Sequence, residues 1–70
     1  MFETLKQIYQ NEYAGELEIN LNGGKNYNFI IPDEFAGINN DDTVEFVKNG
    51  NRITIEPLYI AALRWDTNEQ

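Results

Sequence analysis

The feature that most limits what this chain can fold into is the absence of both cysteine and histidine from only 70 residues. A chain this short buries only about 60% of its unfolded surface, so such folds usually need a disulfide, a metal or a second subunit. Without cysteine there is no disulfide, and without histidine as well the usual zinc ligands are missing. We therefore expect a single domain without metal or other cofactor, stabilised as a homo-oligomer.

The charge balance narrows the choice of partner. Acidic residues outnumber basic residues by 12 to 5, which gives a formal net charge of −7. Binding to nucleic acid requires lysine and arginine to displace counterions from phosphates. The basic residues here are scattered: Lys6, Lys25, Lys48, Arg52 and Arg64. The excess of acidic residues disfavours nucleic acid as a partner, unless an oligomer brings the basic residues together on one face. The same negative net charge helps to keep a small domain soluble.

The sequence also bears on the compartment. No apolar run approaches the roughly 20 residues that a membrane helix requires. Residues Met1–Gln10 are charged and amphipathic, unlike a secretory signal peptide. A chain without cysteine suits a reducing compartment. We expect a cytoplasmic protein with no membrane partner.

Hydrophobic periodicity in the first half predicts a helix and two strands. Apolar residues recur at helical spacing in Phe2–Asn11, whereas Glu16–Asn22 alternates apolar and polar residues as a half-buried strand does. The Asn-Gly-Gly-Lys turn that follows leads into a second strand, Asn26–Ile31. Pro32 ends that strand because proline lacks a ladder donor.

The second half predicts three further strands. Thr43–Lys48 and Arg52–Glu56 flank Asn49-Gly50, which is the clearest hairpin signal in the chain. After the corner at Pro57, Leu58–Trp65 is expected to form a turn of 3₁₀ helix and a fifth strand, with a short α-helix as the alternative.

The region between the two halves, Asp33–Asp42, is predicted to be irregular, with Phe35 turned inward. The whole pattern is typical of a mainly β fold. We expect a short N-terminal helix followed by a five-stranded, strongly bent small antiparallel barrel over residues 1–66, with a disordered tail at 67–70.

This order of elements resembles the Sm-like family, which includes the bacterial RNA chaperone Hfq. The resemblance covers nearly all of the chain and uses these segments: Phe2–Asn11, Leu21-Asn22-Gly23, Phe29–Ile31 running into Asp33–Phe35, Ile53–Ile55 and Tyr59–Leu63. In that family the last two strands pair between neighbouring subunits and close a ring. The resemblance implies a homo-oligomer joined through Arg52–Glu56 and Ile60–Trp65, with these interface residues: Ile53, Ile55, Ile60, Leu63 and Trp65.

The sequence departs from the Sm-like family at two positions that matter for RNA recognition. The second glycine of the family's first motif falls at Asn28. The Tyr-Lys-His triplet of Hfq falls near Leu58–Ile60, where neither lysine nor histidine is present. The resemblance therefore implies the shape and the assembly of the family, without its uridine recognition.

The middle of the chain also resembles the AbrB/MazE-like swapped-hairpin domains of transcription factors and antitoxins. The matching segments are Ile31–Phe35, Asp42–Phe46, Gly50 and Ile53–Pro57. That family carries basic residues for DNA after its Ile-Pro, whereas Asp33–Asp42 is acidic here. This second resemblance implies a DNA-binding regulator.

The residues for catalysis are sparse, and we expect no enzyme activity. Serine, cysteine and histidine are all absent, so no nucleophilic triad can form. The acid pairs Asp33/Glu34 and Asp41/Asp42 are adjacent in loops, and glycosidase chemistry needs two carboxylates that face each other across a cleft. The Gly23-Gly24-Lys25 sequence lacks the rest of a phosphate loop and indicates a hairpin turn.

Binding is therefore the expected activity, and aromatic residues are the expected anchors. We expect Lys25, Tyr27, Phe35 and Tyr59 to contact a ligand or a partner, most simply another protein. The alternatives are a nucleic-acid-binding regulator, either an Sm-like RNA-binding ring or an AbrB-like antitoxin, and an acidic inhibitor of phage or mobile-element origin that mimics nucleic acid.

Overall fold

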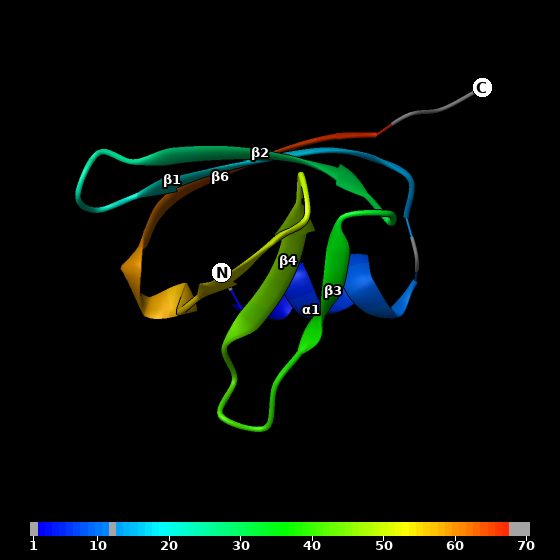
Figure 1. Ribbon diagram of the computed structural model, residues 1–70, viewed down its shortest axis with the longest axis horizontal. Coiled ribbons are helices and arrows are strands. Elements are labelled where there is room, and N and C mark those ends of the chain that lie inside the picture. Colours follow the sequence, from blue (N-terminus) through cyan, green and yellow to red (C-terminus); the bar gives the residue numbers. More distant parts are fainter. Residues whose placement is uncertain (1, 12, 68–70) are drawn as a thin grey trace.

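The computed structural model describes residues 2–11 and 13–67. These residues form one α-helix, one short 3₁₀ helix and six strands (Figure 1). The elements, in chain order, are α1 Phe2–Gln10, β1 Gly15–Leu21, β2 Asn26–Ile31, β3 Phe35–Ile38, β4 Val44–Lys48, β5 Asn51–Ile55, η1 Pro57–Tyr59 and β6 Ile60–Thr67. The predicted mainly β fold with a short N-terminal helix is confirmed.

The strands form two antiparallel sheets of three strands each, in the orders β2-β1-β6 and β3-β4-β5. The prediction of a five-stranded bent barrel is wrong in its finer detail, because the described residues form six strands and no closed barrel. The difference arises at Pro32, which cannot donate to a ladder. The chain leaves the first sheet there, and the Phe35 N–H donates to the Pro32 carbonyl at 3.1 Å before the second sheet begins.

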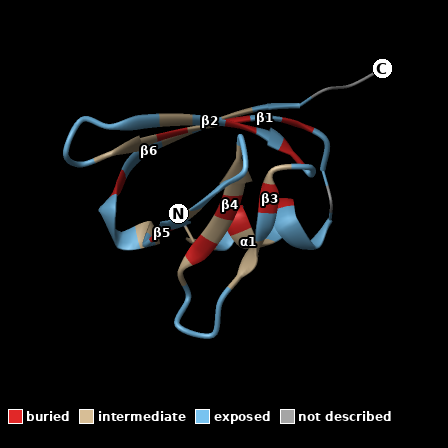
Figure 2. Ribbon diagram, in the orientation of Figure 1, coloured by how far each residue is buried: buried red, intermediate tan, exposed pale blue. Residues whose placement is uncertain are grey.

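The core lies between the two sheets and α1 (Figure 2). The alternation predicted for β1 holds, since Leu17 and Ile19 are fully buried while Glu16 is exposed. The rings of Phe29 and Phe46 stack across the two sheets, with centroids 4.0 Å apart and planes 5° apart. The buried residues are Leu5, Ile8, Leu17, Ile19, Phe29, Ile31, Phe35, Val44, Phe46, Ile55 and Ile60.

The hairpin at Asn49-Gly50 is confirmed. Lys48 pairs with Asn51 across a turn of two residues. Asn49 and Gly50 have φ angles of 53° and 80°, as a type I′ turn requires. This turn sets the register of β4 against β5 and so places Ile55 in the core.

Two segments differ from their predictions. The prediction of an irregular Asp33–Asp42 is wrong for its central part, where β3 pairs with β4 through a bulge between Phe35 and Gly37. The α-helical alternative for Leu58–Trp65 is also wrong, because η1 and the strand β6 occupy it. A proline at the start of η1 fits a 3₁₀ turn, and Ile60 resumes extended geometry because it pairs with Leu21 in the first sheet.

The folded domain also extends one residue further toward the C-terminus than predicted. Thr67, which was predicted to begin a disordered tail, is the last residue of β6 and pairs with Gly15. Residues 68–70 of that tail lie outside the described residues. Within the described part of the chain, no helix is long and apolar enough to cross a membrane.

Candidate protein-interaction site

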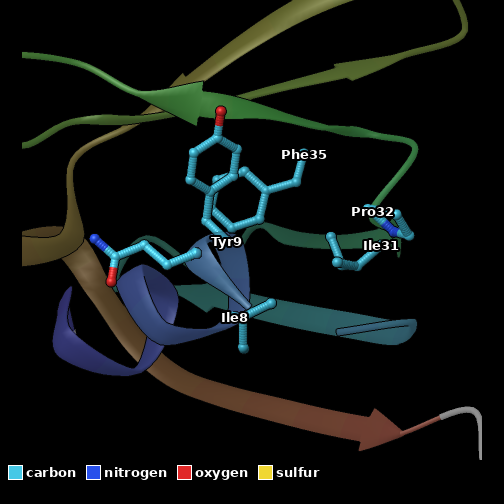
Figure 3. A pocket seen from close by; sticks show the side chains of 6 residues that line it. Ile8, Tyr9, Ile31, Pro32 and Phe35 are labelled. Atoms are coloured by element: carbon cyan, nitrogen blue, oxygen red, sulfur yellow. The ribbon is translucent and has the colours of Figure 1, made fainter. Parts of the chain in front are cut away.

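A cavity of about 300 Å³ opens between the end of α1 and the corner that joins β2 to β3 (Figure 3). Its lining residues are Ile8, Tyr9, Gln10, Ile31, Pro32 and Phe35. The cavity is small for a drug-sized ligand, since such sites span about 300–1,000 Å³. An apolar wall of this size suits a single large side chain of a partner.

Tyr9 forms the rim of this cavity. Its ring packs at 45° against Phe35 with the centroids 5.0 Å apart. Tyr9 is 39% exposed whereas Phe35 is 5% exposed, so the tyrosine covers the phenylalanine. The Tyr9 hydroxyl points toward the neighbouring strand (Figure 3), where a Cβ at Gly37 would lie 3.5 Å from it. Tyr9 lies within the predicted helix Phe2–Asn11, but no local pattern in the sequence shows that Pro32 lies nearby.

A row of contacting aromatic rings continues from this cavity through the core to a second partly exposed tyrosine, Tyr27. Phe35 contacts Phe46 with centroids 4.6 Å apart, and Phe46 stacks on Phe29. Phe29 in turn stacks on Tyr27, with centroids 5.7 Å apart and planes 13° apart. The row begins and ends with a tyrosine that keeps part of its surface exposed. Rigid aromatic packing of this kind holds both surface tyrosines in fixed orientations.

The four residues expected to bind a partner fall into two places. Lys25 lies over the ring of Tyr27, with Nζ 5.4 Å from the centroid. Tyr59 lies near the same turn, because its carbonyl accepts a hydrogen bond of 2.9 Å from the Asn22 N–H. Phe35 belongs to the core beside the cavity, and two rings, those of Phe46 and Phe29, lie between it and Tyr27.

The most exposed large apolar side chains belong to η1, the short helix between β5 and β6. Leu58 is 75% exposed and Tyr59 is 55% exposed. Exposed apolar residues grouped in this way often mark contacts with another chain. Together with the Lys25–Tyr27 pair they give this end of the molecule an aromatic and apolar surface.

The residues expected at an oligomer interface divide between the core and the sheet edges. Ile55 and Ile60 are buried within a single chain, at 4% and 8% exposure. Ile53, Leu63 and Trp65 are half-buried and pack against that core. They belong to β5 and β6, each of which is one of the two outer strands of its sheet.

The outer edge of β2 is covered, in contrast to the edges of β5 and β6. The Ile30 N–H donates to Glu34 Oε1 at 2.6 Å, and the Glu34 N–H donates to the Ile30 carbonyl at 2.8 Å. Lys48 donates its ammonium group to the Asn28 carbonyl of the same edge. The Ile60 N–H donates to the Pro57 carbonyl at the end of η1, and among residues 51–55 and 61–67 no backbone hydrogen bond outside the sheet ladders is present. Exposed edges of this kind are templates for another strand.

Three of the basic side chains lie beside carboxylates. Arg52 Nε is 2.9 Å from Glu45 Oε2, and Arg64 Nε is 3.7 Å from Asp66 Oδ2. Lys48 Nζ is 3.9 Å from the carboxylate that covers the β2 edge. These positive charges are therefore partly neutralised within the chain, which weakens any attraction to phosphate.

The acid pairs of the loops have structural partners. In the turn before β4, the Thr43 hydroxyl donates to Asp41 Oδ1 at 2.6 Å and the Thr43 N–H donates to the same atom at 3.2 Å. These hydrogen bonds hold the pKa of Asp41 below its ordinary value. Among residues 2–11 and 13–67, no group of three acidic side chains is arranged to hold a metal ion.

Comparison of the chain with known protein families, with curated proteins and with solved structures gave no match. The features of this chain that bear on its function are therefore the cavity, the exposed apolar surface and the open strand edges.

Proposed function

We propose that this protein is a non-enzymatic binding module that self-associates and acts through contacts with other protein chains. The observation that carries the proposal is the pair of uncovered outer strands, β5 and β6, in a molecule whose β2 edge is covered by side chains. Half-buried Ile53, Leu63 and Trp65 lie on these strands. A second chain added there would gain backbone hydrogen bonds and bury apolar surface.

The small size of the domain supports self-association. A chain of 70 residues without disulfides has a small core, and burial of further apolar surface in an oligomer adds to its stability. If β2 and β3 are taken as one strand interrupted at Pro32, the order of elements is the helix and five strands of the Sm-like resemblance. The Sm-like architecture is part of the proposal on this basis.

The cavity beside Tyr9 supports a protein rather than a nucleic acid as the further partner. Its walls are mainly apolar, and its polar groups include the Gln10 amide and the Tyr9 hydroxyl. Nucleic-acid sites combine aromatic stacking with a basic groove. Here the net charge is −7, and Lys48, Arg52 and Arg64 lie beside carboxylates. Protein interfaces, in contrast, are enriched in partly exposed tyrosine and other aromatic residues.

Light scattering over a range of protein concentrations tests the proposal. We expect a mass above that of the 8.1 kDa monomer at micromolar concentration, falling toward the monomer on dilution. Fluorescence anisotropy with unstructured RNA and DNA should give dissociation constants no tighter than about 10⁻⁴–10⁻⁶ M at physiological salt. A monomer at every concentration would reject self-association, and nanomolar binding to an oligonucleotide would favour a nucleic-acid regulator instead.

A further inference from the structure

The hydrogen bonds of the first sheet determine which backbone groups of β6 face its open edge. In β2, the N–H and C=O of Ile30 both bond to Glu34, so they point away from β1. Backbone groups alternate in direction along a strand. The adjacent residue Phe29 therefore faces β1, where it lies opposite Leu17.

The same alternation continues through β1 into β6. Because Leu17 faces β2, its neighbour Glu18 faces β6, where it lies opposite Arg64. Arg64 is thus bonded inward to β1, and the residues on either side of it, Leu63 and Trp65, direct their N–H and C=O groups toward the open edge. An added strand would bond to these two residues.

The side chains along this edge are complementary to a second copy of themselves. Arg64 and Asp66 lie on the outer face of the sheet, with side chains 73% and 63% exposed. If two β6 strands pair antiparallel with Trp65 opposite Trp65, Arg64 of each chain lies opposite Asp66 of the other. In this register the N–H and C=O groups of Trp65, which face the edge, bond to those of Trp65 in the other chain. The register also contains two cross-strand ion pairs, one on each side of Trp65.

We propose that two copies of this chain associate through their β6 edges in this register, which joins the two first sheets into one sheet of six strands. The inference rests on the proposed function, because it specifies one form of the self-association. Leu63 and Trp65 would extend the apolar inner face across the junction. Such an interface is symmetric, so it closes as a dimer.

Pairing of β6 with β5 of another copy, as the Sm-like resemblance implies, offers less complementary charge. β5 has the sequence Asn-Arg-Ile-Thr-Ile and contains no acidic residue. The antiparallel register that places Asp66 opposite Arg52 places Arg64 opposite Thr54, so it contains one ion pair. The symmetric register provides both ion pairs from residues already on the edge, and for this reason we favour it.

Charge reversal tests the register directly. Arg64→Asp places two aspartates opposite each other in the dimer, and Asp66→Arg places two arginines opposite each other. Each variant alone should associate at least about tenfold more weakly than the original chain, because two attractive pairs become repulsive. An equimolar mixture of the two variants should associate again, as should the chain carrying both changes, because opposite charges then face each other.

Two measurements follow the association. Light scattering gives the mass, and the emission of Trp65, which is the only tryptophan in the chain, should shift to shorter wavelength as the strands pair. Lys6→Glu on α1 makes the same change in net charge as Arg64→Asp at a distance from the edge, and it should leave association within about twofold of the original. Circular dichroism confirms that each variant keeps its fold.

The possible outcomes test the register and the proposed self-association independently. Recovery in the mixture and in the double variant supports the symmetric register. Association that neither single variant weakens, or that the mixture does not restore, would overturn the register while leaving self-association in place. A monomer at every concentration for the original chain would reject both.

Discussion

Replacement of Gly50 by alanine tests the hairpin that sets the register of the second sheet. Gly50 has a φ angle of 80°, which L-residues rarely adopt. A Cβ built at this position meets no atom within 4 Å. The cost of Gly50→Ala is therefore backbone strain without a clash. A left-handed conformation costs an L-residue about 1–2 kcal/mol.

Gly23 provides a matched control in the turn between β1 and β2. A Cβ there also meets no atom within 4 Å, and its φ lies outside the left-handed region. Both changes remove a glycine and restrict the unfolded chain, which stabilises by about 0.4–1 kcal/mol at a compatible site. This gain cancels in the comparison. The difference in the free energy of unfolding between Gly50→Ala and Gly23→Ala is thus the strain alone.

Thermal unfolding followed by circular dichroism measures this difference. In a domain of this size 1 kcal/mol corresponds to about 4–8 °C in Tm, so Gly50→Ala should melt about 4–16 °C below Gly23→Ala. Both variants are compared at the same protein concentration, because association also raises Tm. Gly50→Val should melt lower still, because a β-branched side chain tolerates a positive φ less well. If Gly50→Ala is as stable as Gly23→Ala, the type I′ turn is not formed and the register argued from it is wrong.

Two further predictions concern β6 and the turn before β4. Gly15→Ala should lower the free energy of unfolding by about 1–3 kcal/mol. The reason is that the alanine Cβ would lie 2.3 Å from the Asp66 carbonyl oxygen and 2.8 Å from the Trp65 ring. If the variant has the same tryptophan emission and the same Tm as the original chain, this packing is wrong. Asp41 should titrate below the ordinary aspartate pKa of about 3.9, because Thr43 donates hydrogen bonds to the carboxylate. The stabilisation from Asp41 is then present above the unfolded pKa and lost as pH falls through the lower folded pKa. Carboxyl NMR measures this midpoint, and a value at or above the ordinary one would refute the assignment.

Local patterns in the sequence were sufficient to predict several elements. The alternation in β1 reflects one buried and one exposed face, which any sheet of this kind imposes on its strands. Asn49-Gly50 predicted its turn because few residues accept a positive φ. In both cases the deciding physical property belongs to the residues themselves and does not depend on the rest of the fold.

The parts that were missed depend on distant neighbours. The strand β3 is stabilised by pairing with β4 and by the packing of Tyr9 on Phe35, and none of this is visible in its own acidic surroundings. The cavity depends in the same way on Pro32 lying beside the end of α1. Residues expected at an interface are also hard to separate from core residues by pattern, as Ile60 shows, because burial in one chain and burial between chains select the same side chains.

The distribution of charge on the sheet edges links the fold to its proposed association. Counted over the whole sequence, acidic and basic residues indicate solubility. In the structure, Glu34 and Lys48 use their charged groups to satisfy the β2 edge, and so they prevent another strand from pairing there. Arg64 and Asp66 lie on the outer face of β6 and leave its backbone groups free. The same residue types therefore block one edge and supply complementary contacts at the other, which gives the domain one direction in which it can extend its first sheet.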